Sequence, residues 1–135
     1  MTSQEKLEHA VEWLKAYYTR VPVSRRKGWC LRDTRAALTE AGLRIPWNAY
    51  PHNLAFSCFE DLKANPGRWQ WQQIHHPLPR YSLVFFGGCG YLKDGRMAGH
   101  IGILDNYGLT VYSNVQTPMS KWWSARLKGA FAPKD

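Results

Sequence analysis

Two residues of the chain have side chains suited to nucleophilic catalysis, Cys30 and His100. Cys30 begins an amphipathic segment, residues 30–41, whose apolar positions recur at helical spacing. The first turn of a helix stabilises a thiolate through unpaired N–H groups and partial positive charge, so we expect Cys30 to be a nucleophile with a lowered thiol pKa. Its own backbone N–H is the expected first donor to an oxyanion. A Cys-His pair distant in sequence and close in space is usual for this class, which predicts His100 as the general base.

A third residue should hold the imidazole ring in its productive tautomer. The residues around Gly108 predict a hairpin that pairs the strand beginning at His100 with the strand that follows the turn. If Gly108 takes the left-handed position of a three-residue loop, Asn114 lies opposite His100; a two-residue loop places Ser113 there instead. We expect Asn114, because Gly108 suits the left-handed position and an amide oxygen accepts well from an imidazole N–H.

The remaining reactive residues fit other roles. Cys89 lies in a glycine-rich loop and is an alternative nucleophile, but it lacks a helix start. Cys58 shares the apolar face of a predicted helix and should belong to the core. The three cysteines form no CxxC pair, and no histidine pair has matching ligand spacing, so we expect no metal and no cofactor. Trp29 precedes the proposed nucleophile and is the expected substrate contact.

The chain is strongly basic, with 18 Lys and Arg against 10 Asp and Glu and a net charge of +8. This balance favours polyanionic partners such as nucleic acid or anionic cell wall. The run Arg25-Arg26-Lys27 precedes Cys30, and we expect it to attract wall polymer. Seven tryptophans and seven tyrosines would also suit stacking on nucleic acid. We expect no nucleic acid, since the basic residues are scattered in sequence and no recognition motif occurs.

Helical patterns come first and strand patterns follow, which is typical of an α+β domain with helices packed on an antiparallel sheet. The 135 residues fit a single domain. We divide it into an N-terminal helix (1–22), a nucleophile helix and a third helix (23–66), and an antiparallel sheet (67–135). The periodicity predicts helices at 7–20, 30–41 and 51–64, a short helix at 120–127, and a meander of strands at 68–74, 81–86, 100–104, 109–115 and 129–131.

Several of these segments together resemble a known family, the CHAP and NlpC/P60 cysteine peptidases. The similarity runs from about residue 26 to residue 133 and is greatest to the N-terminal peptidase modules of bacteriophage lysins. It rests on Gly28-Trp29-Cys30, Leu83-Val84-Phe85-Phe86, Gly99-His100-Ile101-Gly102, Tyr112-Ser113-Asn114, Trp122-Trp123 and Gly129-Ala130-Phe131. One departure is Pro79-Arg80-Tyr81-Ser82, which stands where the family has a proline-glycine-aspartate sequence.

The resemblance implies a papain-like fold and cleavage of bacterial peptidoglycan, as an endopeptidase or an amidase. It implies Cys30 and His100 as the catalytic pair and Asn114 as the orienting residue, although the third residue varies in the family. The chain has neither an apolar signal segment nor a long apolar run, so we expect no membrane partner. We expect a monomer, made in the cytoplasm of an infected or producing bacterium and acting on the wall after release. Alternatives are a non-catalytic nucleic-acid-binding or virion protein, and an acyltransferase with the same pair.

Overall fold

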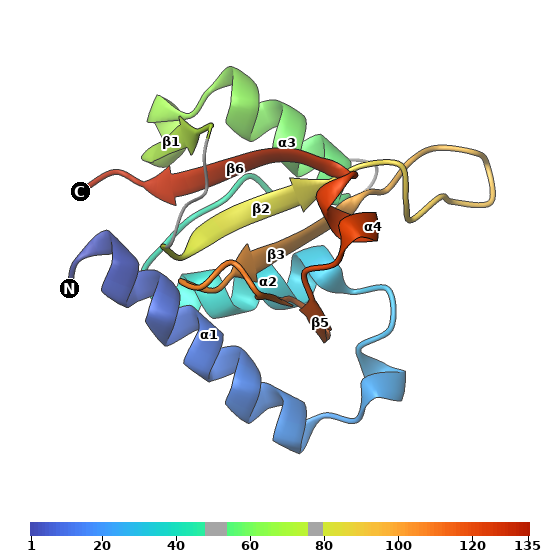
Figure 1. Cartoon of the computed structure of the whole chain (residues 1–135), viewed down its shortest axis with the longest axis horizontal. Coiled ribbons are helices and arrows are strands. Elements are labelled where there is room, and N and C mark those ends of the chain that lie inside the picture. Colours follow the sequence, from blue (N-terminus) through green and yellow to red (C-terminus); the bar gives the residue numbers. More distant parts are fainter. Residues whose placement is uncertain (48–53, 76–79) are drawn as a thin grey trace.

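The computed structural model of the chain describes residues 1–47, 54–75 and 80–135. It has an α+β architecture, in which three helices pack on one face of a six-stranded antiparallel sheet (Figure 1). The expected fold class is therefore confirmed at this level. None of the described helices is long and apolar enough to cross a membrane.

The three predicted helices are present, but the first begins at Ser3, four residues before the predicted start, and the third begins at Ala55. Thr2 and Glu5 form a capping box at the start of the first helix, as their spacing predicts. Gly42 follows the second helix with a φ of 80°, a left-handed conformation that glycine adopts without strain. The start predicted at Pro51 lies outside the described residues. The helices are α1 (Ser3–Arg20), α2 (Cys30–Glu40) and α3 (Ala55–Ala64), with short 3-10 turns η1 (Val23–Arg25) and η2 (Gly67–Trp69).

The sheet is not the simple meander predicted from the sequence. Its spatial order is β1-β6-β2-β3-β4-β5, so the last strand lies between the first two. The physical reason is packing: Phe131 of the last strand contacts Phe85 edge to face at 5.8 Å within the core under the helices. The strands are β1 (Trp71–Ile74), β2 (Ser82–Phe86), β3 (His100–Leu104), β4 (Thr110–Tyr112), β5 (Gln116–Pro118) and β6 (Leu127–Pro133).

Several elements of the second half differ from the prediction. Residues 67–69 form η2, and Gln70 has a φ of 63°, so β1 begins only at Trp71. The strand β4 ends at Tyr112, because the next backbone N–H bonds within a tight turn. The short strand β5 was not predicted. The predicted helix at 120–127 is limited to α4 (Lys121–Ser124).

Residues along each strand alternate between two apolar layers. Ile101 and Ile103 face the layer under α1, α2 and α3, which also holds Cys58 with 1% of its surface exposed, so its predicted core position is confirmed. Phe86 and Leu104 face the opposite layer, against which Trp123 of α4 packs. The two proposed catalytic residues lie at one end of this sheet, where α2 begins beside β3.

Candidate active site

Cys30 is the first residue of α2, as the sequence predicted. Trp29 precedes it as the N-cap residue and makes no side-chain capping bond. The backbone N–H groups of Ile101 and Leu31 lie near the Cys30 sulfur and act to lower the pKa of its thiol. The first of these groups belongs to β3, which places the thiol beside the residue that follows His100.

The position of the thiol depends on the early end of β4. Every second residue along a strand points its backbone N–H to the same side. Because the N–H of Asp105 donates to Thr110 of β4, the N–H of Ile101, four residues earlier, also points toward β4. No strand residue pairs with Ile101 there, since the described ladder between β3 and β4 reaches only Tyr112. The Cys30 thiol lies near this N–H group, which acts to lower its pKa.

His100 begins β3, and its ring lies on the face of the sheet opposite the three helices. The ring packs against Trp123 at 4.9 Å and Phe86 at 6.0 Å between centroids. Its Nε2 atom lies 3.3 Å from Oγ of Ser113. Among the described residues no hydrogen bond joins the ring directly to Cys30. Contact between the two side chains therefore requires the ring to reach around the edge of β3.

A chain of four hydrogen-bonding groups determines which ring nitrogen carries the proton. The carbonyl oxygen of Arg26 only accepts, so Nδ2 of Asn114 faces it at 2.9 Å and the Asn114 Oδ1 faces Ser113. The Ser113 hydroxyl faces two acceptors, this Oδ1 at 3.1 Å and the Val115 carbonyl oxygen at 3.4 Å, and its proton goes to one of them. The hydroxyl then offers an acceptor to Nε2 of His100, so these hydrogen bonds favour the tautomer with the proton on Nε2 and the free electron pair on Nδ1.

The register of the hairpin differs from both predicted alternatives. Asp105 bonds to Thr110 and Leu104 pairs with Val111, which makes the loop longer than either three or two residues. The predicted pairing of His100 with Asn114 is wrong for this reason. Ser113 contacts the ring instead, from a position opposite Gly102, and Asn114 lies one hydrogen bond further away.

Gly102 makes this contact possible. A Cβ at Gly102 would lie 2.5 Å from Cγ1 of Val111 and 3.0 Å from the Tyr112 carbonyl oxygen. The absence of a side chain lets β4 approach closely, so Ser113 can reach diagonally to His100.

Arg26 belongs to the framework of the site and is not a free cation. The residue is 8% exposed, and its guanidinium lies 4.6 Å from the Tyr18 ring centre. It donates to the carbonyl oxygens of Val21 and Asn114. The expectation that all of Arg25-Arg26-Lys27 attracts wall polymer is therefore wrong for Arg26. Its reciprocal bonds with Asn114 tie the loop before α2 to the end of β4.

The ionisation of the pair differs from the expectation. Burial is the largest influence on Cys30 and raises its thiol pKa, although the N–H groups of Leu31 and Ile101 oppose this change. Burial also lowers the pKa of His100 to about 4. The predicted lowering of the Cys30 pKa is wrong for this conformation, because enclosure outweighs the helix start. At neutral pH the pair consists of a thiol and an uncharged imidazole.

A pocket of about 220 Å³ opens beside Cys30. Trp29 and Trp47 line it with 47% and 44% of their surfaces exposed, and Ala98 and Leu54 supply part of its apolar wall. The exposure of Trp29 suits the predicted role in substrate binding, while Trp47 was not identified from the sequence. Cys89 is partly buried and packs against the opposite layer, where it lines no part of this pocket.

Comparison of the chain with known proteins gave no match to a protein family, to a curated protein or to a solved structure. In the described part of the chain, no three His, Cys, Asp or Glu side chains come together in a group that could hold a metal ion.

Proposed function

We propose that the chain is a peptidoglycan hydrolase of the papain-like NlpC/P60 type that cuts an amide bond, as an endopeptidase or an amidase. The observation that carries this proposal is the position of Cys30. Its thiol lies at the start of α2, near the backbone N–H of Ile101, the residue that follows His100 in β3. The order of sequence motifs around Cys30, His100 and Ser113 is the second support.

In the proposed reaction, Nδ1 of His100 takes the proton of the Cys30 thiol as the sulfur attacks the amide carbonyl carbon. The C–N bond then breaks, and the imidazolium gives its proton to the leaving amine. Water hydrolyses the resulting thioester, with His100 again acting as base, and this step releases the carboxylic acid and restores the thiol. The backbone N–H groups at the start of α2 would stabilise the oxyanion.

The uncharged resting pair gives substrate binding a role in this mechanism. A thiol with a raised pKa and an imidazole with a lowered pKa disfavour the ion pair in the free protein. A carbonyl group beside the sulfur removes the need for a stable thiolate, because proton transfer and attack occur together. A bound substrate would also draw the ring of His100 toward the sulfur around the edge of β3.

The direct test is mass spectrometry of purified peptidoglycan after incubation with the protein. We expect new termini at one type of amide bond, which also distinguishes an endopeptidase from an amidase. Cys30→Ala should abolish the products, whereas Cys89→Ala, which removes a thiol outside the pocket, should retain them. Products that persist with Cys30→Ala and disappear with Cys89→Ala would overturn the assignment of the nucleophile.

Transfer of the acyl group to an amine, in place of water, would use the same two residues. A mass increase equal to an added amine compound, in place of hydrolysis, would identify this alternative in the same experiment.

A further inference from the structure

Three neighbouring pockets form a continuous surface that begins at Cys30. The pocket beside Cys30 shares Trp47 with a second pocket of about 190 Å³. The second pocket shares Arg44 and Trp69 with a third, of about 100 Å³, which extends to Lys134. We call this surface the Arg-Trp track and define it by Trp29, Arg32, Arg35, Trp47, Arg44, Trp69, Arg68 and Lys134.

The track combines basic residues with tryptophans. Guanidinium groups lie over tryptophan rings, with 4.3 Å from Arg32 to Trp29 and 4.5 Å from Arg35 to Trp47 between the group and the ring centre. Further along, the Trp69 ring has two such neighbours, Arg44 at 5.5 Å and Arg68 at 5.6 Å. Stacking on a ring holds a guanidinium flat and leaves its N–H edge free for an oxyanion.

The charge of the track is not balanced by acids. No Asp or Glu lines any of its three pockets. Arg32 does bond to the buried carboxylate of Asp33 at 3.0 Å. Within residues 1–47, 54–75 and 80–135, however, Arg35, Arg44 and Arg68 have no carboxylate partner. The indole N–H of Trp69 is also buried without an acceptor in the same part of the chain.

We infer that the Arg-Trp track binds the anionic portion of the wall substrate, a polymer that carries carboxylate or phosphate groups along a chain of saccharide rings. This inference rests on the proposed function, because the track opens directly into the pocket of Cys30. Nucleic acid carries similar charges and rings but has no backbone amide bond for a thiol to cut. Continuity with the thiol therefore favours the wall polymer.

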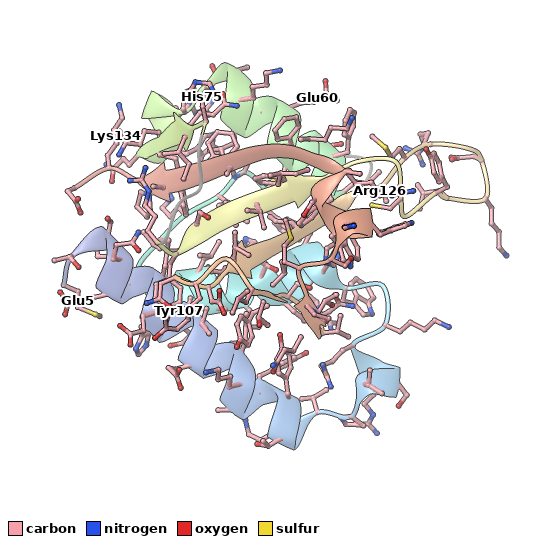
Figure 2. All side chains as sticks on the ribbon, in the orientation of Figure 1. Glu5, Glu60, His75, Tyr107, Arg126 and Lys134 are labelled. Carbon is pink, nitrogen blue, oxygen red and sulfur yellow. The ribbon has the colours of Figure 1, made fainter. Side chains whose placement is uncertain are left out.

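The track also gives the substrate a direction. The helix α2 alone spans about 16 Å at 1.5 Å per residue, enough for several units of an extended polymer. The polymer would run from Cys30 along α2 toward Lys134, which lies at the opposite end of the molecule from Arg126 (Figure 2). The scissile bond is then near one end of the bound segment, and affinity comes mainly from contacts beyond it.

The test is a binding measurement on the full chain carrying Cys30→Ala, so that no cleavage occurs. Adding Arg35→Gln and Arg44→Gln should lower the affinity for purified sacculi about tenfold and reduce its dependence on salt concentration. The matched control is Arg20→Gln with Lys93→Gln, which removes the same charge from exposed positions outside the three pockets. Arg20 also lies over a tryptophan, Trp13, at 6.0 Å, so the control repeats the stacking geometry.

The Arg35→Lys and Arg44→Lys pair keeps the charge but lacks the planar group, and intermediate binding is expected. If circular dichroism shows that the Gln pair does not fold, the Lys pair replaces it in the binding measurement. Equal binding by the Gln pair and its control would overturn the inference. So would a loss of single-stranded oligonucleotide binding with no loss of sacculus binding.

The same variants on the unmodified Cys30 background separate this inference from the proposed function. A short soluble wall fragment does not reach along the track, so the Arg35→Gln and Arg44→Gln pair should slow its cleavage less than it slows the cleavage of intact sacculi. If the unmodified protein cuts the wall but the track variants bind normally, only the track is wrong. If sacculus binding depends on the track but nothing is cut, only the hydrolase is wrong.

Discussion

At the scale of single residues, the site depends on where protons and donors lie. The carbonyl oxygen of Arg26 accepts from Asn114 Nδ2 and so orients the Asn114 amide, whose Oδ1 then faces the Ser113 hydroxyl. The hydroxyl offers an acceptor to Nε2 of His100, which favours the tautomer with an unprotonated Nδ1. Each step follows because one partner can only accept. The orienting function expected of one residue is thus divided between two, and Ser113 is the residue that touches the ring.

Because Ser113 and Asn114 act through one hydrogen-bonded chain, their effects on turnover should not add. Ser113→Ala should lower kcat about 10-fold to 100-fold, since the ring is then free to adopt the other tautomer. Asn114→Ala should lower it as well, and the double variant should be little worse than Ser113→Ala alone. The measurement is a double-mutant cycle on a soluble wall fragment, with Ser124→Ala as the control for loss of an exposed hydroxyl. Independent effects that multiply in the double variant would contradict the chain.

At the scale of elements, the site lies where β4 stops and α2 begins. The end of β4 at Tyr112 frees the N–H of Ile101 for the thiol, and the uncapped start of α2 supplies that thiol. The reciprocal bonds between Arg26 and Asn114 hold these two elements together. The close approach of β4 to β3 therefore controls both the nucleophile and the base.

Gly102→Ala tests this dependence. The new Cβ would meet Val111 and the Tyr112 backbone, push β4 away from β3 and withdraw Ser113 from His100. We expect a loss of about 1–3 kcal/mol in the free energy of unfolding, together with a fall in kcat. Gly67→Ala is the matched control, because its Cβ would meet only Lys134 Nζ, at 3.9 Å. Urea unfolding and turnover on a soluble fragment provide the measurements, and a Gly102→Ala protein as stable and active as this control would refute the argument.

At the scale of the whole molecule, two apolar layers enclose the sheet and cover Cys30 and His100, the proposed catalytic pair. Trp123 of α4 and Phe86 of β2 cover the His100 ring, while the layer under α1, α2 and α3 receives Cys30. Figure 1 shows α4 on the side of the sheet away from α2. Because both layers enclose the site, the stability of the fold depends on whether the His100 imidazole is protonated.

The buried imidazole predicts a loss of stability in acid. The pKa of His100 is about 4 in the folded chain and about 6.5 when unfolded. Between these values the unfolded chain binds the extra proton, so the free energy of unfolding falls as the pH drops from about 6.5 to about 4. Urea titrations at pH 7.0, 5.5 and 4.5, conditions chosen to cover roughly this window, should show a smaller fall for His100→Gln than for the unmodified protein. His9→Gln is the control for an exposed histidine, and parallel curves for all three proteins would rule out the effect.

The sequence by itself determined the local features of this protein. The capping box predicts the start of α1, the amphipathic pattern and Gly42 predict α2, and the Cys30 helix position and the strand at His100 follow from the same periodicities. These features depend on neighbours within a few residues, so the pattern of a single segment specifies them. The basic composition likewise predicts an anionic partner class.

Only the tertiary structure decided how these features meet. The insertion of β6 beside β2, the register that brings Ser113 to His100, and the burial that reverses the expected Cys30 pKa all depend on contacts between distant segments. The same holds for Arg26, which looked like a solvated cation in sequence but is buried against Tyr18. A one-residue change in register moves every side chain to the other face, and burial depends on what packs from elsewhere, so neither follows from local pattern.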